Sequence, residues 1–172
     1  LERRPGSDSE SGSDRRLAWG SRSDVGLIRD HNEDSYLCRP PLFAVSDGMG
    51  GHAAGEVASS IAIHTIAKEA PATADSAQLG AAIEAANMDV LTAPETGRGR
   101  EGMGCTATAC IIEDDRMAVA HVGDSRLYLL HKGALVRVTH DHSFVEELVD
   151  AGEITADEAR VHPSRSVITR AL

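Results

Sequence analysis

The sequence predicts an α+β fold in which antiparallel sheets are flanked by helices. Runs of β-type residues come in hairpin-like groups separated by turn signals, two helical stretches stand between these groups, and further helices follow the last of them. A parallel sheet would instead need strands and helices to alternate regularly along the chain. The order of the elements therefore favours antiparallel pairing.

The N-terminal third of the chain predicts a leader and three strands. Residues 1–16 are rich in Ser, Gly, Asp and Arg, a composition typical of disorder, so we expect a domain that starts at residue 17. Three short β-type runs follow, and Pro40-Pro41 separates the second from the third because proline cannot donate to a strand ladder. The predicted strands are residues 17–24, 35–38 and 42–46.

Helical periodicity begins after this third strand. Apolar residues from Ala54 to Ile66 recur at helical spacing and predict a helix over residues 53–69, which Pro71 ends. A second helix is expected over residues 76–91, followed by a Gly/Arg loop over residues 94–104. The remaining elements are four strands and two helices, expected at residues 105–112, 117–122, 127–130, 135–138, 143–151 and 155–160.

Composition excludes several classes of function. The formal net charge is −10, so the surface repels phosphate backbones, and we expect neither nucleic acid nor anionic membrane as a partner. No apolar run reaches the ~18 residues of a membrane span. The three cysteines, Cys38, Cys105 and Cys110, form neither an even set nor a CxxC pair, which favours a reducing cytoplasm.

The segment Asp47-Gly48-Met49-Gly50-Gly51-His52 follows a buried strand and opens a helix. The spacing of its glycines fits a dinucleotide-binding loop, but no β-rich run follows the helix, and Asp47 would face the pyrophosphate with a negative charge. A hard-metal site is the better interpretation. The carboxylate of Asp47 and a neighbouring glycine carbonyl are oxygen ligands of the kind that Mg²⁺ or Mn²⁺ prefers.

Further carboxylates stand at comparable positions. Glu33 and Asp34 precede a strand, and Asp124 follows another. Each of them alone is most simply a turn or capping residue. If strand pairing brings these ends together, three acids meet at one edge of a sheet, where like charges repel unless cations bridge them.

Four motifs together resemble the metal-dependent protein phosphatase family, the type 2C serine/threonine phosphatases of bacterial type. The resemblance covers residues 22–172, and residues 139–143 through 162–166 look like the flap region of the bacterial branch. The motifs are Arg29-x-x-Asn32-Glu33-Asp34, Asp47-Gly48-Met49-Gly50-Gly51-His52, Gly104-Cys105-Thr106-Ala107-Thr108 and Val122-Gly123-Asp124-Ser125-Arg126.

This resemblance implies a four-layer α-β-β-α sandwich, of which this chain is the N-terminal portion, truncated at the C-terminal side. It implies that Asp47 bridges two Mg²⁺ or Mn²⁺ ions, with the Gly48 carbonyl as a further ligand, and that Glu33 holds metal-bound water. Asp34 is expected just behind the ligands. Asp124 and the Ser166 carbonyl are expected at a third, weaker metal site.

The resemblance also implies the chemistry. Arg29 would grip the substrate phosphate with its planar guanidinium, and a metal-bridged water would hydrolyse phosphoserine or phosphothreonine without a phosphoenzyme. Eukaryotic members usually carry a histidine where this chain has Met49, so His52 and His162 are kept as candidate general acids. The family's later acidic motifs would lie beyond Leu172, and we therefore expect residues 1–172 alone to be inactive.

The expected partners are phosphoproteins and cytosolic serine/threonine kinases, and the expected state is a cytoplasmic monomer. The alternative is a non-catalytic phosphopeptide-binding or regulatory module with an incomplete metal site.

Overall fold

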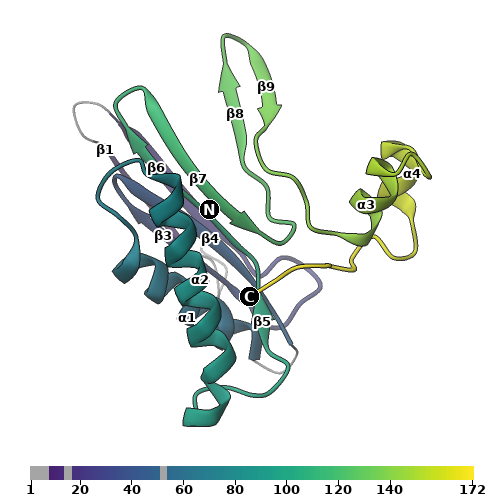
Figure 1. The fold of residues 1–172 in the computed structure, drawn as a ribbon, viewed down its shortest axis with the longest axis horizontal. Coiled ribbons are helices and arrows are strands. Elements are labelled where there is room, and N and C mark those ends of the chain that lie inside the picture. Colours follow the sequence, from purple (N-terminus) through teal and green to yellow (C-terminus); the bar gives the residue numbers. More distant parts are fainter. Residues whose placement is uncertain (1–7, 14–16, 51–53) are drawn as a thin grey trace.

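The computed structural model describes residues 8–13, 17–50 and 54–172. Its centre is an antiparallel sheet with the strand order β3-β4-β6-β7, in which the short β5 extends the pairing of β4 (Figure 1). The strands are β3 (Asp34–Arg39), β4 (Leu42–Met49), β5 (Gly104–Cys105), β6 (Ala107–Glu113) and β7 (Arg116–Val122). The predicted antiparallel α+β class is confirmed.

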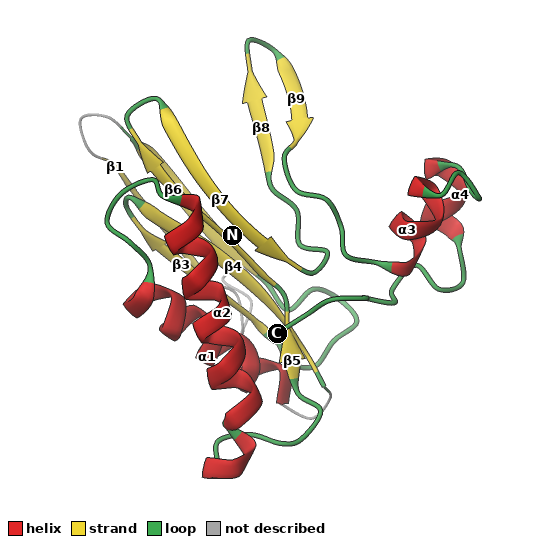
Figure 2. Cartoon of the chain, viewed as in Figure 1, coloured by secondary structure: helices red, strands yellow, loops and turns green. Residues whose placement is uncertain are grey.

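Two helices, α1 (Ala54–Glu69) and α2 (Ser76–Thr92), cover one face of this sheet (Figure 2). Small residues such as Ala58 and Ala62 on α1 and Ala107 and Ala109 on β6 are almost completely buried between the two layers. Without bulky side chains there, the helix backbone can approach the sheet closely. The N-cap Asp75 starts α2 by accepting a hydrogen bond from the Gln78 backbone N–H at 3.0 Å.

Two hairpins and a pair of short helices complete the fold. The hairpins are β1 (Asp8–Ser13) with β2 (Ala18–Ser23), and β8 (Tyr128–His131) with β9 (Ala134–Arg137). After the 3-10 turn η1 (Pro94–Thr96) and the later strands, the chain forms α3 (Phe144–Asp150) and α4 (Ala156–Val161), which pack on each other. Figure 1 shows β8–β9 and α3–α4 projecting from the sheet on the side away from α1 and α2.

Three sequence expectations need correction. Disorder over residues 1–16 is wrong for Asp8–Ser13, because these residues pair with β2, where the Trp19 ring lies over Gly12. The remaining residues of that leader lie outside the described residues. The single strand expected over residues 105–112 is divided at Thr106. In the β8–β9 hairpin each strand lies one residue closer to the turn than expected, and both turn residues, Lys132 and Gly133, have positive φ.

Among the described residues, no helix has the length and apolar character that a membrane crossing requires.

Candidate metal and phosphate site

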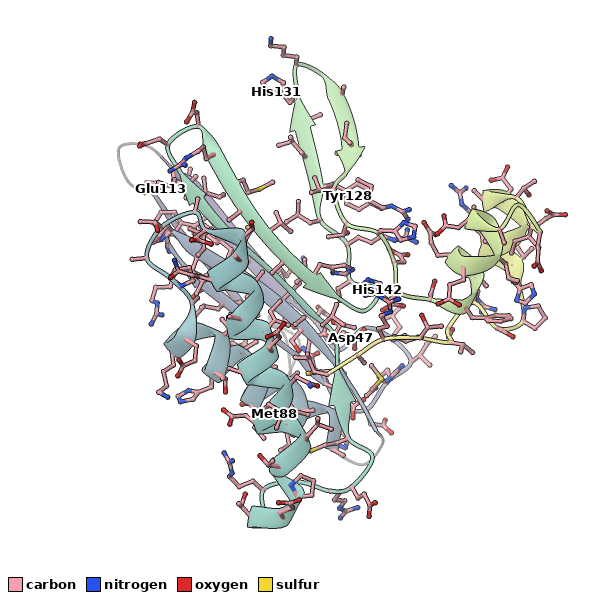
Figure 3. All side chains as sticks on the ribbon, in the orientation of Figure 1. Asp47, Met88, Glu113, Tyr128, His131 and His142 are labelled. Carbon is pink, nitrogen blue, oxygen red and sulfur yellow. The ribbon has the colours of Figure 1, made fainter. Side chains whose placement is uncertain are left out.

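Strand β4 places Asp47 at one end of the sheet, and Glu113 lies at the other end (Figure 3). Its residues alternate in burial: Ala44, Ser46 and Gly48 are buried, whereas Val45 and Asp47 are exposed. Thr106 fixes this end of the strand. Its backbone carbonyl accepts a hydrogen bond from the Ser46 hydroxyl at 2.6 Å, and its own hydroxyl accepts one from the Asp47 backbone N–H at 2.9 Å.

Gly48 lies in direct backbone contact with the first turn of α1. A Cβ atom added at Gly48 would lie 2.0 Å from the Gly55 carbonyl oxygen and 2.7 Å from the Glu33 carbonyl oxygen. The Gly48 N–H donates to that Glu33 oxygen at 3.1 Å. The absence of a side chain therefore brings Gly48, the α1 backbone and Glu33 together at one point.

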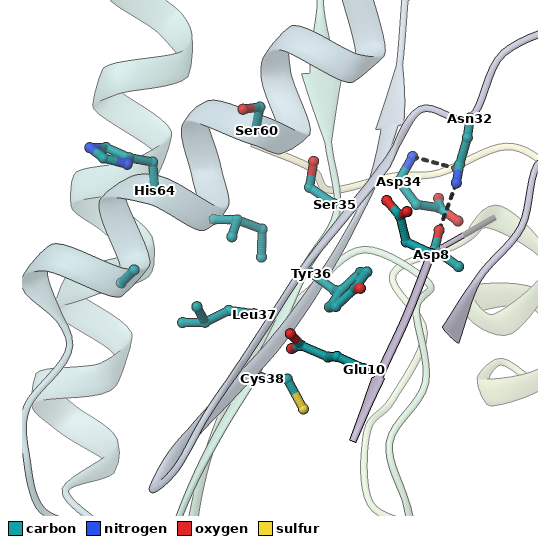
Figure 4. A pocket seen from close by; sticks show the side chains of 13 residues that line it. Asp8, Glu10, Asn32, Asp34, Ser35, Tyr36, Leu37, Cys38, Ser60 and His64 are labelled. Atoms are coloured by element: carbon teal, nitrogen blue, oxygen red, sulfur yellow. Dashed lines mark hydrogen bonds between the residues drawn. The ribbon is translucent and has the colours of Figure 1, made fainter. Parts of the chain in front are cut away.

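The polar segment before β3 is ordered by local hydrogen bonds. The Asn32 side chain donates to the Ser23 hydroxyl at 2.6 Å and accepts from the Asp34 backbone N–H at 3.1 Å (Figure 4). Arg29 donates to the Glu33 carboxylate at 3.4 Å, with its own side chain mostly exposed. Asp34 pairs with Asp47 in the β3–β4 register, so two of the predicted carboxylates belong to residues that lie directly opposite each other on neighbouring strands.

Asp124 follows β7 in a loop that is anchored to the same threonine. Gly123 adopts a φ of 104°, and a Cβ atom there would lie 2.5 Å from the Thr106 methyl carbon. The hydroxyls of Thr106 and Ser125 lie 2.7 Å apart. Thr106 thus contacts both strand ends that carry the carboxylates, a role that sequence reasoning missed.

A cleft of about 580 Å³ collects most of the predicted site residues. It also includes Arg165, which no sequence motif had marked as a site residue. The predicted residues that line it are Arg29, Glu33, Asp47, Gly48, Asp124 and Ser166.

The other predicted residues lie elsewhere. Asp34 lines an adjoining cavity of about 200 Å³, which Asp47 lines as well. Asp34 also lines a second cavity of about 620 Å³ beside β3 and α1 (Figure 4). His162 follows α4, where its ring lies 6.2 Å from that of Phe144 and its Nδ1 atom accepts from the Ser164 N–H at 3.1 Å. It is not among the cleft residues, and His52 lies outside the described residues.

The charges in the cleft match a divalent cation. Burial and the negative charges of Asp34 and Asp124 raise the pKa of Asp47 above its usual value, and Arg29 only partly offsets them. A cation among these oxygen donors would relieve the repulsion. Within the described ranges, however, no three His, Cys, Asp or Glu residues come close enough to hold a metal ion by themselves. The acids share one cleft without forming a complete ligand set.

With this geometry in place, comparison with known proteins identifies the family. The model of the family described as protein phosphatase 2C matches residues 14–148. The chain belongs to the protein phosphatase 2C family.

Curated members of the protein phosphatase 2C family resemble most of this chain. The chain is 46% identical over 159 residues to the serine/threonine protein phosphatase PstP of Mycobacterium tuberculosis, covering 91% of this chain and 31% of that protein. It is 39% identical over 163 residues to the serine/threonine phosphatase stp of Listeria innocua, covering 88% of this chain and 65% of that protein. The chain therefore spans 31% of the length of the first relative and 65% of the length of the second.

Solved structures of family members share the fold. A crystal structure of the M. tuberculosis phosphatase PstP/Ppp superimposes with a TM-score of 0.80 at 43% identity, covering 96% of this chain and 68% of that chain. A crystal structure of the PstP catalytic domain in complex with two manganese ions gives a TM-score of 0.75 at 41% identity, covering 96% and 66%. The predicted membership and fold are confirmed, whereas the role of each site residue remains a prediction.

Proposed function

We propose that this chain forms part of a bacterial-type phosphatase that hydrolyses phosphoserine and phosphothreonine in proteins with the help of Mn²⁺ or Mg²⁺. The observation that carries the proposal is the cleft that places Arg29, Asp47 and Asp124 together. The raised pKa of Asp47 supports it, because carboxylates crowded in this way need a cation to remain charged together.

In this proposal the acidic residues hold the cations. Asp47 would serve as a ligand shared by two ions, the Gly48 carbonyl would be a further ligand, and Glu33 would orient metal-bound water. Asp124 and the Ser166 carbonyl would hold a third, weaker ion. When bound, the ions supply Lewis-acid activation of water and neutralise charge on the phosphate.

Arg29 binds the substrate. Its side chain is mostly exposed at the cleft, and its contact with Glu33 at 3.4 Å leaves other donors of the guanidinium free to grip two phosphate oxygens. The proposal assigns the cleft carboxylates of Asp47 and Asp124 to the cations, and the other described residues that line the cleft include no cysteine or histidine that could form a covalent phosphoenzyme. We therefore propose a single displacement by water.

The residues 1–172 alone should be inactive. The described acids do not close a ligand set for a metal ion, and the related phosphatases are longer than this chain. The proposed substrates are phosphoproteins modified by serine/threonine kinases in the cytoplasm, a compartment that suits three free cysteines. A monomer is the expected state.

The decisive experiment measures phosphate release from a phosphothreonine peptide by the intact protein. We expect turnover with Mn²⁺, loss of turnover in excess EDTA, and recovery when Mn²⁺ is restored. Release that persists in EDTA would overturn the proposal. Peptide binding without hydrolysis at any metal concentration would favour the alternative, a non-catalytic phosphopeptide-binding module.

A further inference from the structure

Asp141 is a buried carboxylate outside the cleft, and the chemistry proposed above does not use it. Only 4% of its side chain is exposed. Arg126 donates to it from two nitrogens, Nε to Oδ1 at 3.1 Å and Nη2 to Oδ2 at 2.5 Å, and a nitrogen of Arg137 lies 3.7 Å from Oδ1. The contact with Arg126 is bidentate, a geometry that fixes orientation as well as distance.

Hydrogen bonds donated by backbone N–H groups join the segments on either side of this ion pair. The His142 N–H donates to the Gly123 carbonyl at 2.8 Å, and the Gly123 N–H donates back to the His142 ring at 3.1 Å. At the other end, the Leu127 N–H donates to the Thr139 hydroxyl at 3.0 Å. We call this contact between residues 123–127 and residues 138–142 the clasp. It encloses Asp124.

His142 of the clasp and the nearby Phe144 also hold the stretch that directly follows Ser166. The Thr169 N–H donates to the His142 carbonyl at 2.9 Å, and the Phe144 N–H donates to the Val167 carbonyl at 2.9 Å. Asp124 and Ser166 line the cleft of about 580 Å³ together, and they also line a neighbouring cavity of about 810 Å³ that contains Asp141. The clasp is therefore the common support of both residues.

The clasp contains an ion pair whose carboxylate, that of Asp141, is buried. A buried carboxylate between two guanidinium groups gains little net stability, because desolvation offsets much of the attraction. Its geometry is nevertheless narrowly defined. Loss of the carboxylate would leave Arg126 and Arg137 without their shared partner. Such a pair is better suited to fixing the position of a loop than to stabilising the whole fold.

We propose that Asp141 is a positioning residue for the proposed phosphatase reaction. Through Arg126 it fixes the loop that carries Asp124, and through its neighbour His142 it holds the stretch that carries Ser166. It thereby sets the separation of these two groups at the cleft. This inference rests on the proposed function, and the experiment below separates the two.

The test compares Asp141→Asn with a matched control, Glu146→Gln, in the intact protein. Glu146 belongs to the same charged network, because it accepts from Arg137 and lies near His140, but neither contact reaches residues 123–127. Arg126→Lys is the second variant. It keeps the positive charge, loses the fork and changes a side chain that is about half exposed (46%), so it should fold even if Asp141→Asn does not.

Two readouts are needed. Hydrogen exchange without metal should show that Asp141→Asn and Arg126→Lys lose protection at the Gly123, Leu127 and Thr169 amides, whereas Glu146→Gln keeps it. The Mn²⁺ concentration for half-maximal turnover should rise by about tenfold in Asp141→Asn and in Arg126→Lys, as for other groups that orient metal ligands. The KM for phosphopeptide should change little, a separation that general destabilisation would not produce.

The proposal is overturned if these amides keep their protection in both variants, or if Glu146→Gln raises the Mn²⁺ requirement as much as Asp141→Asn does. A wild-type protein without turnover, whose Asp141→Asn variant still loosens the same amides, would contradict the proposed function and leave the clasp supported.

Discussion

Asp47 and Asp124 line the same cleft, but the chain holds these two residues by different means. Asp47 lies near the end of β4, in the sheet that packs on α1 and α2, where Ile66, Leu79 and Ile111 are fully buried. Asp124 starts the projecting part of the chain, in which α3 has one buried residue and α4 has none. Hydrogen bonds and ion pairs of the clasp hold this second part in place.

This difference has consequences for how each wall of the cleft responds to change. Apolar burial is non-directional and is shared among many contacts, so the wall that carries Asp47 should yield only when the whole fold is destabilised. Hydrogen bonds depend on individual distances and angles, so the wall that carries Asp124 should respond locally to single substitutions. The following experiments test this contrast.

Gly48→Ala should produce the largest effect. The added Cβ atom would lie 2.0 Å from the Gly55 carbonyl oxygen, and backbone atoms on both sides prevent an easy adjustment. We expect a loss of about 3 kcal/mol in the free energy of unfolding, measured by urea denaturation, together with loss of turnover. Gly80→Ala is the control, because a Cβ there meets nothing within 4 Å, and it should stabilise α2 by about 0.5–1 kcal/mol. Wild-type stability of Gly48→Ala would contradict the close packing.

Arg29→Lys should have an intermediate effect, confined to the binding of substrate. Lysine keeps the charge but cannot reproduce the fork, so the KM for phosphopeptide should rise by about tenfold, the equivalent of one charge-assisted hydrogen bond. Mn²⁺ affinity, followed by calorimetry, should stay unchanged. Arg116→Lys, at the β6–β7 turn, should alter neither quantity. An equal fall in metal affinity would mean that Arg29 supports the site instead of binding phosphate.

Removing helix caps should separate the two regions at a smaller scale. Asp75 caps α2, and Thr155 forms a capping box with Glu158 at α4, so each change to alanine costs about 1 kcal/mol. Asp75→Ala should lower the Tm because α2 is part of the core. Thr155→Ala should leave the Tm unchanged and increase hydrogen exchange in α4 alone. Equal falls in Tm would show that α4 unfolds together with the core.

The smallest effect concerns Asp47 in the absence of metal. Its pKa is raised in the folded state, so its contribution to stability is present below its unfolded pKa and is lost as the pH rises through the folded value. Asp47→Asn should therefore be as stable as the wild type or slightly more stable at pH 7 in EDTA, and the difference should shrink toward pH 4. A clear loss of stability in thermal unfolding at pH 7 would contradict the crowding of carboxylates.

The sequence predicted the parts of the fold that rest on periodic patterns. The apolar stripe of α1 and the buried run of β4 carry their own signals, and the carboxylates at strand ends followed from the motifs. Asp8–Ser13 could not be predicted as a strand, because its Ser, Gly and Asp residues disfavour strands and its pairing with β2 overrides that preference.

The contacts of the site were harder to predict than its residues. Thr106 and the Arg126–Asp141 pair join residues that are distant in sequence, and no local spacing indicates such partners. His162 is a candidate general acid only because Met49 stands where eukaryotic members carry a histidine, and its position after α4 is set by how α3 and α4 pack. Tertiary placement decides these assignments.

We propose that Asp47 is the shared ligand of the metal ions that support hydrolysis. The most direct test measures phosphate release from a phosphothreonine peptide by the intact Asp47→Asn protein across a Mn²⁺ titration, with metal binding followed by calorimetry. We expect weakened Mn²⁺ binding and no measurable turnover at concentrations that saturate the wild type, in a protein that remains folded. Wild-type turnover of the folded variant would contradict it.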